Sequence, residues 1–78
     1  MLSPMNPIDQ IATGKKLRRQ RRMADCSMAQ VAAEMGVSRA YIGLLETGKR
    51  AWSRALIREY KSALEWAISI NKITAEKA

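Results

Sequence analysis

The chain has 78 residues, enough for one small domain, and its 14 Lys and Arg against 7 Asp and Glu give a net charge of +7. A core this small predicts marginal stability or help from oligomerisation. The charge favours a polyanionic partner, because each neutralised phosphate releases condensed counterions. The alternative is that the charge only keeps the protein soluble.

The composition argues against an enzyme and against a metal or cofactor site. Histidine is absent, and the seven carboxylates are scattered without a paired or metal-binding spacing. The lone Cys26 cannot form a disulfide within the chain, which suits a reducing cytosol. We expect it to pack as a small apolar group, with a redox-sensing thiol as the alternative. No signal peptide or membrane-spanning run is evident, so we expect a cytoplasmic protein.

The first expected helix runs from about Pro7 to Met23. Asn6 followed by Pro7 resembles a cap with proline at the first helical position, and Asp9 suits the helix dipole. Gly14 weakens the middle of this helix. Its expected apolar contacts are Ile8, Ile11, Ala12 and Leu17.

The most informative pattern lies between Met28 and Thr47 and reads MAQVAAEMGVSRAYIGLLET. It predicts two short helices, from about Met28 to Met35 and from about Arg39 to Glu46. In the first of them Val31 and Met35 are four apart, and in the second Ile42 and Leu45 are three apart, so each pair lies on one helical face.

The residues between these helices suit a tight corner. Gly36 favours the left-handed conformation that ends a helix, and Val37 plugs the corner. Ser27 and Ser38 are good N-caps, because a hydroxyl can accept an unpaired backbone N–H. Ala32 is small where the two helices must cross closely. The agreement of these placements at one spacing predicts a helix-turn-helix, a DNA-binding motif.

The segment from Thr47 to Arg50 predicts a turn, after which Ser53 can cap a long last helix that reaches about Asn71. No strand pattern competes, so the expected fold is all-α, a small bundle of four to five helices with a long C-terminal helix. The apolar positions of the last helix that would cover the core are Leu56, Ile57, Tyr60, Ala63, Leu64, Ala67 and Ile68.

A second apolar stripe on the last helix consists of Trp66, Ile70 and Ile73. A small monomer has little reason to expose three such side chains together. We therefore expect a homodimer interface, which would set two recognition helices roughly 34 Å apart over a palindromic site. The alternative is that the helix bends and the stripe covers its own core.

From about Thr13 to Leu64 the sequence resembles the Cro/C1-type (XRE-like) helix-turn-helix family of bacterial and phage regulators, which implies a lambda-repressor-like DNA-binding domain. The resemblance also implies an ion pair between Arg21 and Glu46; two independent surface charges are the alternative. The matching residues are Leu17, Arg21, Ser27, Val31, Ala32, Met35, Gly36, Val37, Ser38, Ile42, Leu45, Glu46, Gly48 and Lys49.

The sequence also departs from this family. Met28 stands where a glutamine usually reaches a phosphate or base, so that contact should be absent or replaced. Gln20 occupies a usually apolar position, Asp25 a common glycine and Trp52 a common proline. The break that the family shows after its fourth helix is missing as well. These differences concern the loops and the C-terminal architecture.

Base recognition should come from the outward face of the helix at 38–46, which carries Arg39, Ala40, Gly43 and Leu44. Arg39 can pair with the O6 and N7 of guanine, or alternatively contact a phosphate. Ala40 and Leu44 favour a thymine methyl, although Leu44 can instead pack against the last helix. Gly43 permits close approach to the base pairs.

The DNA backbone would be held on several sides. Ser38 and its helix N-terminus suit an anion, and Tyr41 can bond a phosphate. The residues after this helix that we expect to grip a strand are Lys49, Arg50 and Arg54. In the basic run from 15 to 22, the residues that share one side are Lys15, Arg18, Arg19 and Arg22. Part of this run is expected to be only a solvated face.

The sequence thus predicts a homodimeric transcriptional repressor from a bacterium, phage or mobile element that binds double-stranded operator DNA, with control of its own operon as one option. Repression is inferred from size, since blocking a promoter needs no second domain. The alternative is an antitoxin or other interaction module that binds a partner protein as well. An RNA adaptor is less favoured, because exposed aromatics are few.

The expected parts of the chain are a loose N-terminus at 1–5, the DNA-binding domain at 6–73 with its dimerisation helix at about 53–71, and a tail at 74–78.

Overall fold

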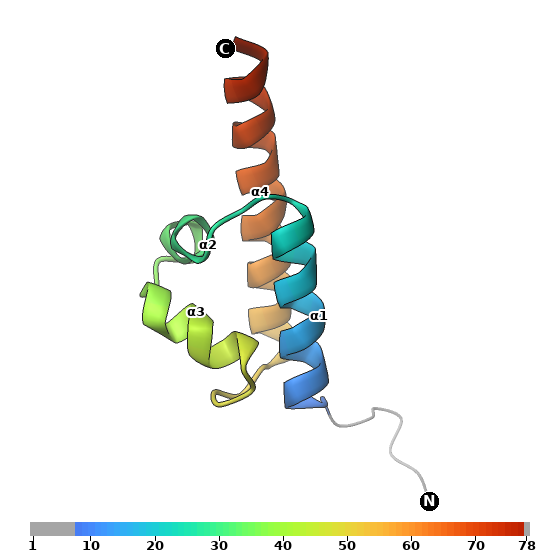
Figure 1. Cartoon of the computed structure of the whole chain (residues 1–78). Coiled ribbons are helices and arrows are strands. Elements are labelled where there is room, and N and C mark those ends of the chain that lie inside the picture. Colours follow the sequence, from blue (N-terminus) through green and yellow to red (C-terminus); the bar gives the residue numbers. More distant parts are fainter. Residues whose placement is uncertain (1–7, 78) are drawn as a thin grey trace, which may run out of the picture.

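The computed structural model describes residues 8–77, and that part of the chain consists of four α-helices without a strand (Figure 1). They are α1 (Gln10–Met23), α2 (Met28–Met35), α3 (Arg39–Glu46) and α4 (Arg54–Lys77). The expected all-α fold with a long last helix is confirmed. None of the described helices is long and apolar enough to cross a bilayer.

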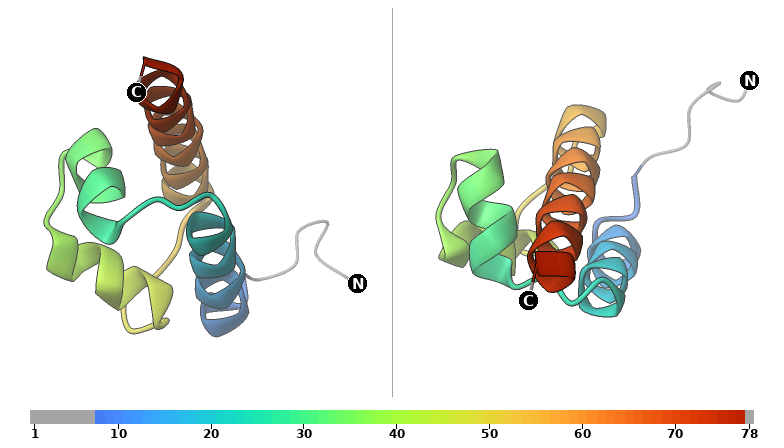
Figure 2. Two further views of the ribbon diagram at one scale, coloured as in Figure 1. Left: turned by 45° about the horizontal axis from the view of Figure 1, so that its top comes forward. Right: turned by 90° about the horizontal axis from the view of Figure 1, so that it is seen from above.

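α1 and α2 pack against α4, and α3 packs against α1 and α2. Seen from above, α4 lies between α1 on one side and the pair α2 and α3 on the other (Figure 2). The largest fully buried side chains come from all four helices: Leu17, Val31, Ile42, Leu45 and Tyr60. Burial of one such side chain contributes about 1.5–3 kcal/mol. The C-terminal part of α4 projects past the other helices (Figure 1).

The helix-turn-helix has the bounds that the sequence predicts, because its capping residues act locally. Ser27 Oγ accepts the backbone N–H of Gln30 at 3.0 Å, and Ser38 Oγ accepts that of Tyr41 at 3.1 Å. The Gln30 side chain returns a bond to the Ser27 N–H at 3.1 Å, which completes a capping box. Gly36 ends α2 with a φ of 70°, in the left-handed region.

The start of α1 differs from the prediction. Ile8 and Asp9 are not helical, and Asp9 is the N-cap, its Oδ1 accepting the Ala12 N–H at 2.9 Å. A carboxylate in this position satisfies an unpaired donor and the helix dipole together. The proposed cap at Asn6 and Pro7 lies outside the described residues, and so does the segment at 1–5, for which a loose N-terminus was expected.

Two of the apolar contacts expected of α1 are wrong. Ile11 is 59% exposed, and Ala12 is exposed as well. Ile11 stands six residues before the buried Leu17, which places it about 120° away around the helix. Ile8 does pack against the core from the segment before α1.

Gly14 is a point of close contact between α1 and α3 rather than a simple weakness. A Cβ added at Gly14 would lie 2.5 Å from the carbonyl oxygen of Glu46 and 2.8 Å from that of Leu45. No real side chain fits there. Glycine therefore lets the backbone of α1 approach the end of α3.

The last helix begins as predicted and continues further. Ser53 Oγ accepts the Leu56 N–H at 3.0 Å. With no Gly or Pro to stop it, α4 passes Asn71 and includes most of the expected tail, up to Lys77. Ala78 lies outside the described residues.

Ile68 in α4 is 41% exposed, so its expected place in the core is wrong. At Asn71 the side chain accepts a bond from Gln30 Nε2 at 2.9 Å, which ties α4 to α2.

Candidate nucleic-acid interface

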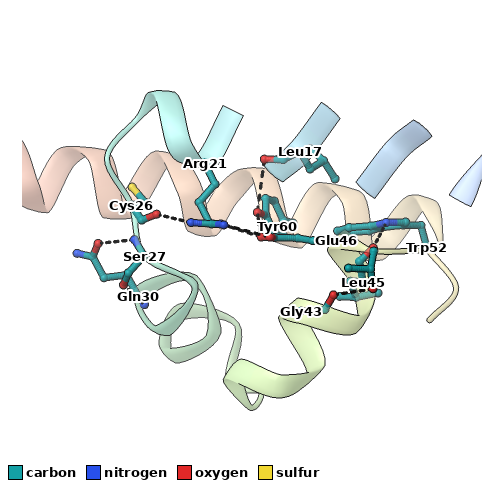
Figure 3. A network of polar contacts seen from close by, with 11 residues as sticks. Leu17, Arg21, Cys26, Ser27, Gln30, Gly43, Leu45, Glu46, Trp52 and Tyr60 are labelled. Carbon is teal, nitrogen blue, oxygen red and sulfur yellow. Dashed lines mark hydrogen bonds and ion pairs between the residues drawn. The ribbon is translucent and has the colours of Figure 1, made fainter. Parts of the chain in front are cut away.

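A buried ion pair joins α1 to the end of α3. Arg21 Nε lies 2.7 Å from Glu46 Oε2, and Arg21 Nη2 donates to Glu46 Oε1 at 3.1 Å (Figure 3). Arg21 Nη1 also donates to the carbonyl oxygen of Cys26 at 2.9 Å. The bond to Glu46 raises the pKa of Arg21. The structure thus brings together the two residues for which the family resemblance implies a pair.

Tyr60 extends this pair into α4. Its hydroxyl donates to Glu46 Oε2 at 2.7 Å, and burial followed by this bond raises the pKa of the phenol (Figure 3). Its ring meets that of Trp52 edge-on, with centroids 5.4 Å apart. The sequence placed Tyr60 only in the core, since apolar spacing gives no sign of where a hydroxyl points.

The outward edge of α3 carries the four residues proposed to contact bases. Arg39, Ala40 and Leu44 are exposed, and Leu44 is 37% accessible. Gly43 is half-buried, yet nothing lies within 4 Å of the position that its Cβ would occupy. The opposite edge, with Ile42 and Leu45, is fully buried. The outward edge of α3 is therefore an open and largely apolar strip with one arginine in the first turn of the helix.

One flank of this strip is the turn between α3 and α4. The backbone N–H groups of Lys49 and Arg50 both donate to the Leu44 carbonyl oxygen, at 2.9 and 3.1 Å. The Arg50 guanidinium carbon lies 6.0 Å from the centre of the Tyr41 ring, within range of a cation–π contact. Lys49 and Arg50 are exposed, and so is Arg54 at the start of α4. The turn therefore presents two cations, Lys49 and Arg50, beside the edge of α3, and Arg54 adds a third exposed cation at the start of α4.

A clamp from α1 holds this turn. The Gln10 side chain bonds both backbone polar groups of Trp52: Gln10 Nε2 donates to the Trp52 carbonyl oxygen at 3.3 Å, and the Trp52 N–H donates to Gln10 Oε1. Trp52 Nε1 donates to the Leu45 carbonyl oxygen at 2.9 Å, which satisfies an orphan acceptor at the end of α3. The contact between Gln10 and Trp52 was not predicted, since the two residues lie 42 positions apart in the sequence.

The other flank of α3 is formed by α1. Arg18 and Arg22 line a pocket together with Gly43 of α3 and Thr47, the C-cap residue of α3. Lys15 and Arg19 lie beside them and, with Arg18 and Arg22, border a second hollow. Within the basic run of α1, Arg18 and Arg22 thus share a pocket with α3, whereas Lys15 and Arg19 border only the second hollow.

The described residues contain no group of three His, Cys, Asp or Glu side chains that could hold a metal ion. Cys26 is a buried free thiol whose pKa is raised by burial.

Comparison with known proteins agrees with this geometry. A helix-turn-helix family model, HTH_3, matches residues 17–64, more than half of the chain. Neither the curated proteins nor the solved structures give a match. The matched stretch holds both helices of the turn, the buried ion pair and the first part of α4. The chain therefore belongs to the Cro/C1-type (XRE-like) helix-turn-helix family of DNA-binding transcriptional regulators.

Proposed function

We propose that the protein is a homodimeric transcriptional repressor that inserts α3 into the major groove of a palindromic operator. The observation that carries this proposal is the exposed edge of α3, with Arg39, Ala40 and Leu44 accessible and cations on both flanks. A helix of this width fits the major groove, and flanking cations match the two phosphate strands that border the groove.

The chemistry of this edge limits what it can read. Arg39 supplies a bidentate donor for guanine, worth about 1–3 kcal/mol of discrimination against a wrong base. Ala40 and Leu44 supply only apolar contact, which suits thymine methyl groups. With one strong hydrogen-bonding reader, the rest of the specificity comes from DNA shape and from the spacing of two half-sites.

The proposed dimer contact is the stripe on α4. Trp66 is 57% exposed, Ile70 is 39% and Ile73 is 53%, so the stripe does not cover the core of its own protomer within the described residues. The stripe begins beside α2, because Trp66 borders a pocket with Glu34 and Met35, and Asn71, which follows Ile70, is bonded to Gln30 of α2. A second copy can bury the same stripe through a twofold axis and remove this apolar surface from water.

Binding of the dimer to its operator is by itself enough to repress transcription. A dimer seated on an operator within a promoter blocks access to that DNA without contacting polymerase. If the operator lies upstream of the protein's own gene, the same step limits its synthesis.

Exchange of Ile70 for Asp tests the dimer. In analytical ultracentrifugation the wild type should have twice the 8.8 kDa monomer mass. Ile70→Asp should have the monomer mass, because a dimer would bury the new carboxylate without a partner. Ile68→Asp is the matched control: Ile68 is 41% exposed on the same helix but about 160° away around it. It should remain a dimer. Monomeric wild type, or equal dissociation of both variants, would contradict the interface.

The same exposed stripe favours a second candidate function, an antitoxin that binds a partner protein. In that case wild type would be monomeric, and the product of the adjacent gene, purified separately, would form a stable complex that Ile70→Asp abolishes.

A further inference from the structure

The side chain of Asn71 in α4 holds the first turn of α2. Gln30 Nε2 donates to Asn71 Oδ1 at 2.9 Å, and both residues are half-buried. The orientation of the Gln30 amide is set by the capping box, because the Ser27 N–H can only donate and bonds Gln30 Oε1 at 3.1 Å. The amide nitrogen of Gln30 is therefore left to face Asn71. In the described part of the chain no other side-chain hydrogen bond joins α2 to α4.

A second polar contact joins the same face of α4 to the end of α3. The Tyr60 hydroxyl donates to Oε2 of Glu46, the last residue of α3, at 2.7 Å. Tyr60 and Asn71 lie about 20° apart around α4 and roughly 16 Å apart along it, since they are separated by eleven positions. The helix-turn-helix is thus bonded to α4 at two points, one at the end of α3 and one at the start of α2.

A single one of these bonds would leave the helix-turn-helix able to pivot on α4. Its packing against α4 otherwise depends on buried apolar side chains, among them Val31 and Ala67. Apolar burial is non-directional, so it opposes separation of the helices more than it opposes a small rotation. A hydrogen bond weakens steeply when its angle is lost. The bond at Asn71 therefore fixes the angle that the contact at Tyr60 leaves open.

We propose that Asn71 is a positioning residue that sets the spacing of the two half-sites in the operator. The inference rests on the proposed function, because it assumes a dimer that α4 holds together through Trp66, Ile70 and Ile73. Asn71 faces α2, and Ile73 lies about 160° away around the helix. The same segment of α4 thus holds the partner on one side and orients the DNA-reading unit on the other.

The distance of α3 from the twofold axis makes this angle important. Each α3 would lie roughly 17 Å from the axis, which is half of the separation between two recognition helices. A rotation of about 10° then moves α3 by about 3 Å, close to the rise of one base pair. A fixed angle between α2 and α4 therefore selects one half-site spacing, and a loose angle accepts several.

The test compares Asn71→Leu with Asn71→Asp. Leucine has a similar size but cannot bond Gln30, whereas a carboxylate oxygen can still accept from Gln30 Nε2. Fluorescence anisotropy would be measured on a duplex selected by wild type, on the same duplex with one base pair inserted or removed between the half-sites, and on a single half-site. Wild type should lose about 10- to 100-fold in affinity at the altered spacings, because the second protomer no longer engages its half-site.

Asn71→Leu should lose less than about fivefold at the altered spacings, while its mass in ultracentrifugation and its affinity for the single half-site match those of wild type. Asn71→Asp should keep the wild-type spacing preference. The positioning role is wrong if Asn71→Leu keeps that preference, binds the single half-site more weakly, or behaves like Asn71→Asp, and also if wild type binds all spacings equally. A monomeric wild type, or one that binds no duplex, would instead contradict the proposed function.

Discussion

Replacing Glu46 with alanine is expected to lower the free energy of unfolding by about 3 kcal/mol, because it leaves a buried guanidinium without its partner. Arg21 and Glu46 are 8% and 4% exposed, so water cannot take over the lost contacts. The Tyr60 hydroxyl loses its acceptor in the same step. For a domain of this size the loss is a large part of the total, which is of order 5–10 kcal/mol.

Urea unfolding followed by circular dichroism measures this loss. The control is the triple variant Arg21→Met/Glu46→Leu/Tyr60→Phe, which replaces the three side chains of the network with apolar groups of similar size and leaves the Cys26 carbonyl oxygen without its Arg21 partner. Removing all partners together costs less than orphaning one, so the triple variant should be more stable than Glu46→Ala. A loss under about 1 kcal/mol for Glu46→Ala would show a pair screened like those on protein surfaces.

Gly14→Ala is expected to destabilise the domain by about 2 kcal/mol, although alanine is the better helix former. The added Cβ would meet the backbone carbonyl oxygen of Glu46 at 2.5 Å. Backbone cannot move aside as a flexible side chain can, so α1 and α3 must separate, and overpacking of this kind typically costs about 1–3 kcal/mol.

Gly43→Ala is the matched control, since Gly43 is also a helical glycine but has open space at its Cβ position. Here the helix propensity of alanine acts alone, and stability should rise by about 0.5–1 kcal/mol. Thermal unfolding of both variants under one condition gives the comparison. Stabilisation by both alanines would show that α1 and α3 do not meet as closely as the structure places them.

Local chemistry explains which parts of the fold the sequence could predict. The bounds of α2 and α3 depend on Ser27, Gly36 and Ser38, whose caps are made within a few residues. The sequence predicted a first helix from about Pro7, with Asp9 suited to the helix dipole, whereas in the structure Asp9 is itself the N-cap. The length of α4 was underestimated because a helix without Gly or Pro has no local signal for its end.

In the candidate site, too, the features set by local sequence could be predicted, and the contacts between distant segments could not. The outward residues of α3 follow from helical periodicity, and their exposure could be anticipated from Ile42 and Leu45 facing inward. The Gln10 and Trp52 clamp, the Tyr60 hydroxyl and the pocket at Gly43 join segments far apart in the chain. Such contacts depend on how the helices cross, which the spacing of apolar residues does not determine.

The most direct test of the DNA-binding role of α3 is the affinity of Arg39→Ala for duplex DNA. Fluorescence anisotropy would be measured at one salt concentration on a duplex selected for binding to wild type and on a random duplex. Because Arg39 is the strongest base-reading group on the exposed edge, its loss should weaken binding to the selected duplex by about 10- to 100-fold. Binding to the random duplex should change much less. Unchanged affinity for both duplexes, with the preference of wild type retained, would contradict the account.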